Sequence, residues 1–264
     1  VYDQELGDHD GARSYYRRYL EALPGDRSAR TIYEDALVRW EAWRELRDLL
    51  EEQSRLIDSV PEKVGLLHRS AVLSDERLSE PVAAIDALRT ILDLDPTDEP
   101  AAASLADLLG RQERWDDLRD HLLWMIGRAD DGHRKDDLTI RLARVEAEHL
   151  GHAATAVDHY GEVLLRTPAN VDAIAALEGM LGDPELRGRV AELLEPALRT
   201  TRDLRKLADI LEVRLESLED VPRRIEALRE IASLELHLGR QRESLHARGR
   251  AWLEDVTNAE TLVE

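Results

Sequence analysis

Apolar residues recur along this chain at the spacings of one face of an α-helix. In the segment "AAIDALRTILDLDP", Ala84, Leu88, Ile91 and Leu92 follow one another at intervals of four, three and one residues, which is the pattern of an amphipathic helix. The segment "WDDLRDHLLWMI" has the same pattern, and the alternation typical of β-strands is missing from the sequence. The pattern therefore predicts an all-α fold.

This helical pattern repeats every 72 residues. Pro24, Pro96 and Pro168 are separated by that interval. Small or apolar residues recur in the same register, in the columns Ala12/Ala84/Ala156, Leu20/Leu92/Leu164, Ala29/Ala101/Ala173, Leu37/Leu109/Leu181 and Leu50/Leu122/Leu194. Each copy is long enough for two helix hairpins of roughly 34–38 residues. The repeat predicts an array of about seven such hairpins.

One type of hairpin carries a recognisable series of residues. A small turn residue is followed by Ala five residues later, by an aromatic residue or Leu four further on, and by Pro eight beyond that. The three series are Gly7–Ala12–Tyr16–Pro24, Ser79–Ala84–Leu88–Pro96 and Gly151–Ala156–Tyr160–Pro168. They resemble the second-helix motif of the tetratricopeptide repeat family. The resemblance covers nearly the whole chain and implies a right-handed superhelical solenoid of antiparallel helix hairpins.

The alternate hairpin departs from that family's motif. Trp43 and Trp115 start its second helix, Leu46 and Leu118 stand where Ala is expected, and a closing Pro is missing. The chain thus resembles a divergent member in which two hairpin types alternate. Its 36 basic residues include only three Lys, which indicates a GC-rich bacterial genome.

The repeat also divides the chain into units and indicates an insertion. The predicted units are 1–25 (a half unit), 26–60, 61–97, 98–132, 133–169, 170–219, 220–257 and 258–264 (the start of another). From Pro168 to its equivalent Thr257 the interval is 89 residues, 17 more than elsewhere. We expect the surplus to form an inserted helix at 185–199, before a helix at 203–217. It is either a tolerated insertion or a kink that shapes a partner site. Both ends are expected to be cut from a longer array.

Composition excludes several classes of function. The net charge is −20, which disfavours non-specific binding to nucleic acid or anionic lipid. Cysteine is absent, which excludes disulfides and thiolate chemistry. Apolar runs fall short of a membrane span, so we expect no membrane insertion and a cytoplasmic location. The chain begins at Val1, so a signal sequence on a longer parent stays possible.

Motifs for catalysis or metal binding are missing. The segment "EHLGH" places His149 and His152 in the wrong order for a HExxH zinc site, and Gly151 breaks the helix between them. The acidic stretch "ILDLDPTDEPAAASL" has Pro96 among its would-be ligands and lacks the glycine of a calcium loop. We read it as a joint, in which Asp98, like Asp26 and Asn170, caps the next helix. We expect no catalytic, cofactor or metal site and no enzymatic activity.

Two columns of charge are the candidate site. Arg69, Arg141 and Arg229 share a position in the first helix of three hairpins, and Asp35 and Asp107 share one in the alternate hairpins. The family resemblance implies that first helices line a concave groove. The arginines could bind acidic or C-terminal peptides there. Alternatively, the Arg and Asp columns pair with each other and hold the stack, which is the interpretation we favour.

The family's carboxylate clamp is not supported, because it needs groove asparagines and this chain has only Asn170 and Asn258, both in turns. The sequence favours a non-enzymatic scaffold that binds a partner protein or peptide mainly along the concave face. Two alternatives remain open. The repeats could be a regulatory or sensor region attached to a kinase or a transcription regulator, or a module that self-associates end to end.

Overall fold

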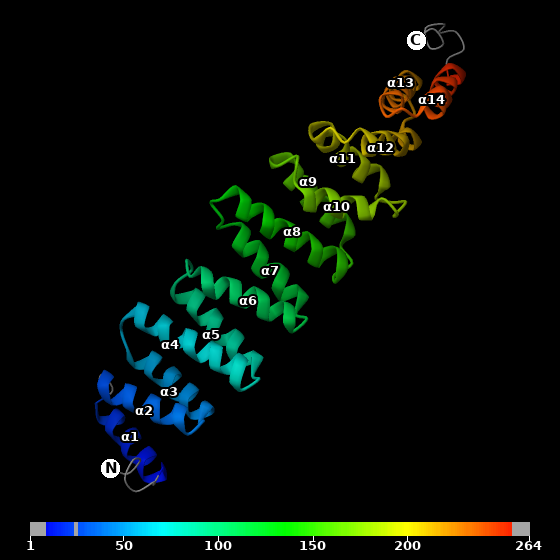
Figure 1. The fold of residues 1–264 in the computed structure, drawn as a ribbon. Helices are drawn as coiled ribbons and strands as arrows, with labels where there is room; N and C mark the ends of the chain where they lie inside the picture. The colour runs from blue at the N-terminus through cyan, green and yellow to red at the C-terminus, as the bar shows by residue number, and fades with distance from the viewer. Residues whose placement is uncertain (1–8, 24–25, 255–264) are drawn as a thin grey trace. The chain divides into compact units, whose positions relative to one another are not determined.

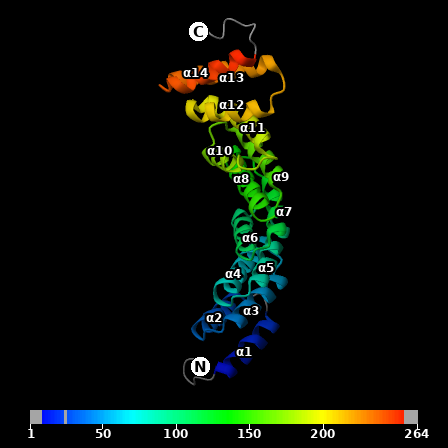
Figure 2. The same cartoon turned by 90° about the vertical axis from the view of Figure 1, so that its right-hand side faces the viewer.

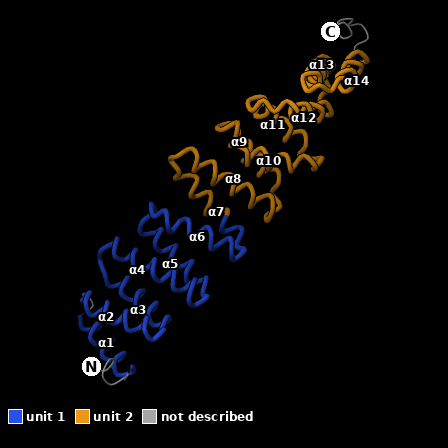
Figure 3. The backbone as a smooth tube through the Cα atoms, viewed as in Figure 1, with its two compact units in different colours: residues 1–118 blue, residues 119–264 orange. Residues whose placement is uncertain are grey.

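The computed structural model describes residues 9–23 and 26–254, and all of the regular structure in these ranges is helical (Figure 1). This confirms the all-α prediction. Gly7, Pro24 and Thr257, which served to define the repeat, lie outside the described residues, as does Asn258. The chain divides into two compact units, residues 1–118 and residues 119–264 (Figure 3).

Fourteen α-helices and one π-helix make up the described residues. They are α1 His9–Ala22, α2 Arg27–Arg39, α3 Trp43–Leu56, α4 Val60–Val72, the π-helix η1 Leu73–Arg77, α5 Pro81–Leu94, α6 Glu99–Arg111, α7 Trp115–Ile126, α8 Gly132–Glu148, α9 Ala153–Arg166, α10 Val171–Met180, α11 Arg187–Thr201, α12 Leu204–Ser217, α13 Val221–His237 and α14 Gln241–Glu254. Within each unit, neighbouring helices pack side by side, as α13 and α14 do in Figures 1 and 2.

A residue in the left-handed backbone conformation marks the turn of every complete hairpin in the described ranges. These residues are Glu41, Ser79, Glu113, Gly151, Arg202 and Gly239, with φ between 53° and 77°. Such a residue ends a helix and reverses the chain. The turns join α2 to α3, α4 to α5, α6 to α7, α8 to α9, α11 to α12 and α13 to α14. Below, the helix before such a turn is called a first helix and the helix after it a second helix.

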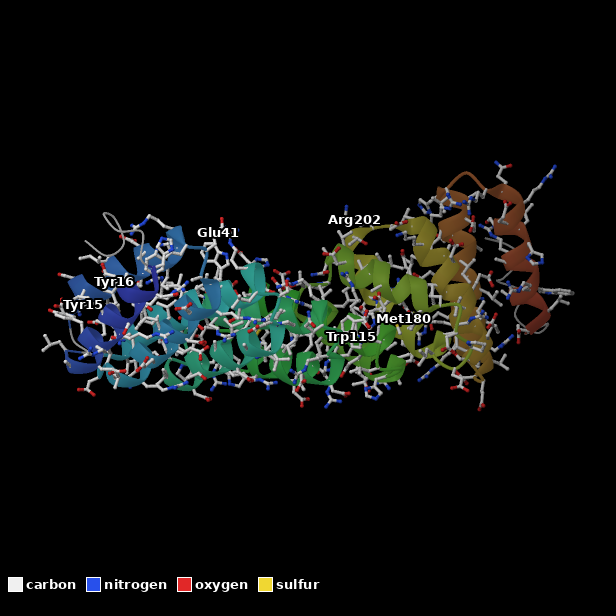
Figure 4. The ribbon with its side chains drawn as sticks, turned by 90° about the horizontal axis from the view of Figure 1, so that it is seen from below. Tyr15, Tyr16, Glu41, Trp115, Met180 and Arg202 are labelled. Carbon is white, nitrogen blue, oxygen red and sulfur yellow. The ribbon has the colours of Figure 1, made fainter. Side chains whose placement is uncertain are left out.

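Helices lie at both places expected around the insertion, α11 at Arg187–Thr201 and α12 at Leu204–Ser217, and which helix is the inserted one stays a prediction. Arg202 and Glu41 each lie at a turn between helices (Figure 4), and with Glu113 they share the left-handed conformation. In all three turns a backbone N–H donates to a carbonyl five residues earlier, as from Asp203 to Leu198 at 3.2 Å. Therefore α11 and α12 form an ordinary hairpin. The helix α10 ends at Met180 and has no hairpin turn of its own. The division into the predicted units otherwise stays a prediction.

The joints between hairpins are capped as predicted. Asp98 accepts a hydrogen bond from the Ala101 N–H at 2.8 Å, and Asn170 accepts one from the Ala173 N–H at 2.9 Å. Asp26 likewise caps α2. The acidic residues of "ILDLDPTDEPAAASL" thus belong to helix ends: Asp93 and Asp95 lie at the end of α5, and Asp98 starts α6, where its side-chain oxygen satisfies an otherwise unpaired N–H. His68 Nε2 lies 2.8 Å from Asp98 Oδ2 and links α4 to this joint.

The recurring small and apolar columns form the cores of both units. Ala12, Ala84 and Ala156 are at most 2% exposed, and a small side chain at that position lets the partner helix approach closely. Leu20, Leu92 and Leu164 are also buried. The repeat therefore records a packing solution, used in each hairpin of this type.

Candidate partner-binding face

Arg69 is held by a buried carboxylate in the first unit. The side chain of Arg69, on α4, lies 2.8 Å from Glu34 Oε2, on the preceding first helix α2. Arg30 approaches the other oxygen of Glu34 at 3.5 Å. The Glu34 side chain is 9% exposed and that of Arg69 49%. The predicted pairing between neighbouring first helices therefore exists here, but its acid is Glu34 and not Asp35.

Asp35 and Asp107 are both exposed, on α2 and α6. Asp35 makes no ion pair or hydrogen bond with its side chain among the described residues. Asp107 lies near Arg111, whose pKa is raised mainly by its hydrogen bond to Asp75 and further by the charge of Asp107. Asp35 therefore does not form the predicted pair with Arg69, whereas the pairing of Asp107 stays a prediction.

In the second unit, the structure separates Arg229 from the arginine column. The buried residues Ala143 on α8 and Ala232 on α13 are equivalent, and the residue two before each is Arg141 and Glu230. The register differs because the two hairpin turns have different lengths. In the α13–α14 turn, the Arg240 N–H donates to the Glu235 carbonyl, five residues earlier. In the α8–α9 turn, the His152 N–H donates to the Glu146 carbonyl, six residues earlier. Counting back from the turns therefore misplaces Arg229 by one residue.

Glu230 occupies the place that Arg69 has in the first unit, and it makes the corresponding contact with reversed sign. Arg199 Nη2 on α11 donates to Glu230 Oε2 at 2.8 Å. Arg229 itself is partly buried, and its Nε and Nη2 have no hydrogen-bond partner among the described residues. Arg141 is partly buried and engaged in contacts of its own.

Glu195 on α11 binds two arginine side chains. It accepts hydrogen bonds from Arg199, at 2.8 Å, and from Arg214 on α12. Burial alone would raise the pKa of Glu195, but the hydrogen bonds from Arg199 and Arg214 lower it below its usual value. Both bonds stabilise the charged carboxylate. Glu195 therefore ties the two helices of its own hairpin together.

Sequence reasoning missed Glu34 and Glu195, although each carries a signal. Each stands among buried residues on an apolar helix face, beside Tyr33 or Leu194. Ala106 holds the equivalent position in α6. A charged residue on a face that is apolar in another copy of the repeat requires a partner, because an unpaired buried charge is costly.

The described residues contain no cluster of three or more His, Asp or Glu side chains suited to a metal ion. In that same part of the chain, every helix is too short or too polar to cross a bilayer.

Comparison with known proteins gives structural likenesses only. No protein-family model matches the chain, and no curated protein does. Among solved structures, YrrB, described as a TPR protein with an unusual peptide-binding site, is 14% identical with a TM-score of 0.30, covering 75% of this chain and 89% of that one. The C-terminal part of a TPR repeat-containing protein from Cytophaga hutchinsonii is 13% identical with a TM-score of 0.42, covering 98% and 95%. The P58(IPK) TPR domain is 13% identical with a TM-score of 0.37, covering 98% and 82%.

The chain's own features define its architecture. Hairpins stack in sequence, alanine columns lie at the helix contacts, and capped joints separate one hairpin from the next. The array is tetratricopeptide-like. Within this tetratricopeptide-like array, ion pairs join successive first helices in each unit, and the acid is supplied by the earlier helix in one case and by the later helix in the other.

Proposed function

We propose that this tetratricopeptide-like array is a non-enzymatic scaffold that binds a partner polypeptide along the first helices of its first unit. The supporting observation is an exposed stripe on α2. Ile32, Asp35 and Val38 follow one another at intervals of three residues, which places them along one side of the helix. Ile32 is 53% exposed and Val38 45%. A contiguous exposed apolar patch with a polar rim is typical of interaction sites, and the unpaired Asp35 carboxylate can accept a charge-assisted hydrogen bond from a basic partner.

The neighbouring first helices extend this stripe with complementary chemistry. Val72 on α4 is 52% exposed, and Asp107 on α6 is exposed as well. Arg69 is engaged by Glu34, so the charge offered to a partner here is mainly the carboxylate of Asp35. The partner segment that fits is therefore extended or helical, apolar, and basic at intervals. In the second unit, Arg141 and Arg229 stay candidate contacts for acidic groups.

A display library of random peptides selects for binding to the full chain. Enriched peptides should combine basic and aliphatic residues, and the double variant Ile32→Asp/Asp35→Lys should weaken them by about tenfold or more, because it removes both an apolar contact and a charge contact. Val82→Asp is the matched control, since Val82 is exposed (63%) on the second helix α5. Equal loss in the control, or enrichment of acidic peptides that ignore the double variant, would contradict the proposal.

A further inference from the structure

The joint between α9 and α10 is apolar where the equivalent joint of the first unit is charged. Residues 167–171 read "TPANV", whereas the equivalent residues 95–99 read "DPTDE". Leu165 is 81% exposed and Val171 is 75% exposed, the highest values for large apolar side chains in the described ranges. In the 72-residue register, Leu165 stands where Asp93 does. At this joint the chain therefore exposes aliphatic side chains at positions that the earlier copy fills with charge.

The exposure of this joint is not caused by an end of the chain, because the joint lies inside the second unit (Figure 1). Helices α8, α10 and α11 pack against α9, and all three are described. Two smaller apolar residues are exposed at the same place, Ala169 in the joint and Ala175 one helical turn after Val171. We call Leu165, Ala169, Val171 and Ala175 the α9–α10 patch.

A buried carboxylate holds this joint in one arrangement. Asp136 on α8, whose side chain is 4% exposed, accepts hydrogen bonds from Arg166 Nε and from the Thr167 hydroxyl, both at 2.7 Å. Asp136 stands where the first unit has Val64, and burying a carboxylate is costly unless it is paired. The α9–α10 patch is therefore preorganised, so a partner that docks on it loses little conformational entropy in ordering it.

The carboxylates beside the patch indicate the charge of its partner. Glu162 lies one helical turn before Leu165, and Asp172 follows Val171 directly. Both acids are exposed, and neither makes a side-chain ion pair or hydrogen bond with a described residue. Arg166, by contrast, is already paired within the joint. The charge offered beside the patch is thus negative, and a Lys or Arg side chain would form charge-assisted hydrogen bonds there.

The same charges disfavour two other occupants. The end segments 1–8 and 255–264 contain three acidic residues each and no basic residue. In a symmetric dimer the same surface of both copies meets, so the carboxylates beside one patch would face those beside the other, and like charges placed face to face are destabilising.

We propose that the α9–α10 patch docks a basic, aliphatic segment of a partner protein. Leu165 and Val171 supply the main apolar contacts, and Glu162 and Asp172 accept hydrogen bonds from its Lys or Arg side chains. An exposed apolar patch with a polar rim is typical of an interaction site. This surface belongs to the second unit and does not rest on the function proposed for the first helices of the first unit.

The probe is a capped, fluorescently labelled amphipathic helix with leucines on one face and lysines on the other. The receptor is the full chain with Ile32→Asp/Asp35→Lys, which removes the stripe on α2 as a second site. Fluorescence anisotropy should show saturable binding. Adding Leu165→Asn/Val171→Gln should weaken it by about tenfold or more, because two apolar contacts are lost. The equivalent positions of the first unit are acidic, so the fold should tolerate these polar side chains.

Three controls separate docking from general attraction to an acidic chain. Glu162→Gln/Asp172→Asn should weaken binding by about fivefold, since two charge contacts are lost. The same peptide with glutamate in place of lysine should bind at least about tenfold more weakly. Val82→Asn is the matched apolar control, because Val82 is 63% exposed on α5, and it should change binding by less than about twofold.

Four outcomes would overturn the proposal. The first is equal weakening by Leu165→Asn/Val171→Gln and by Val82→Asn, and the second is equal or tighter binding of the glutamate peptide. The third is binding by the unmodified chain that Ile32→Asp/Asp35→Lys abolishes, which would leave the function proposed for α2 standing and remove this one. The fourth is a concentration-dependent dimer, measured by light scattering, that Leu165→Asn/Val171→Gln dissociates, which would make a second copy the occupant.

Discussion

Glu34 in the first unit and Glu195 in the second occupy the same place in their hairpins, seven residues before the turn residues Glu41 and Arg202. Both are buried or nearly so, and both bind two arginines, one from their own helix. They differ in the second arginine. Glu34 takes Arg69 from the next first helix, whereas Glu195 takes Arg214 from the second helix of its own hairpin.

The neighbouring second helix explains the difference. Twelve residues after the turn, the first unit has Gln53 and the second unit has Arg214. Gln53 is buried and its Oε1 has no hydrogen-bond partner among the described residues, so Glu34 stays available to Arg69. In the second unit Glu195 pairs with Arg214, so the ion pair between successive first helices is formed instead by Arg199 and Glu230. A repeated position therefore preserves the need for a pair and not the identity of the partner.

The largest change in stability is expected when the carboxylate charge of Glu195 or Glu34 is removed. Glu195→Gln should lower the free energy of unfolding by about 2 kcal/mol, because two arginines lose a common acceptor. Glu34→Gln should cost about half as much, since Arg30 approaches it only at 3.5 Å. Urea unfolding followed by circular dichroism measures both. A larger loss for Glu34→Gln would reverse the ranking and with it the role assigned to Arg214.

Double-mutant cycles measure directly which carboxylate is coupled to Arg69. Arg69 and Glu34 should show a coupling energy of about 1 kcal/mol, as expected for an ion pair with one buried member. Arg69 and Asp35 should show almost none, since Asp35 is exposed and Arg69 pairs with Glu34. Alanine substitutions, singly and in pairs, provide the measurement. Comparable coupling in the two cycles would restore Asp35 as the partner of the arginine column.

The smallest effect is expected at Arg229. Arg229→Met keeps most of the side-chain volume and removes two buried nitrogen atoms, Nε and Nη2, that have no partner among the described residues. It should leave the chain equally stable or stabilise it by up to about 0.5 kcal/mol. Arg69→Met should destabilise it, because Glu34 then loses its closest partner. Thermal melts of the two variants decide the matter, and a lower midpoint for Arg229→Met would show that its guanidinium is paired.

Much of the fold could be predicted because helix periodicity and the alanine columns reflect contacts that every hairpin repeats. The capping residues Asp98 and Asn170 could be predicted for the same reason. Helices α10 and α11 could be placed because both start in the 72-residue register, but the turn between α11 and α12 could not, because it is made by Arg202. A left-handed arginine gives no sequence signal comparable to a glycine.

The candidate site could be predicted only in part. Arg69 and the exposed Asp35 and Asp107 were found from their spacing, but their partners were not. Arg229 entered the column because one residue is missing between Glu235 and the α13–α14 turn, and such a change shifts side chains by a third of a helical turn. Which arginine reaches which carboxylate depends on side-chain length and on neighbours such as Gln53, which column counting does not capture.

The ion pairs between successive first helices also affect how the chain folds. Their partners are close in sequence: 35 residues separate Arg69 from Glu34, and 31 separate Arg199 from Glu230. A hairpin thus depends on its immediate neighbours, and little entropy is spent on closing long loops. Unfolding of such a chain proceeds in segments, so a partner that binds one segment stabilises that segment first.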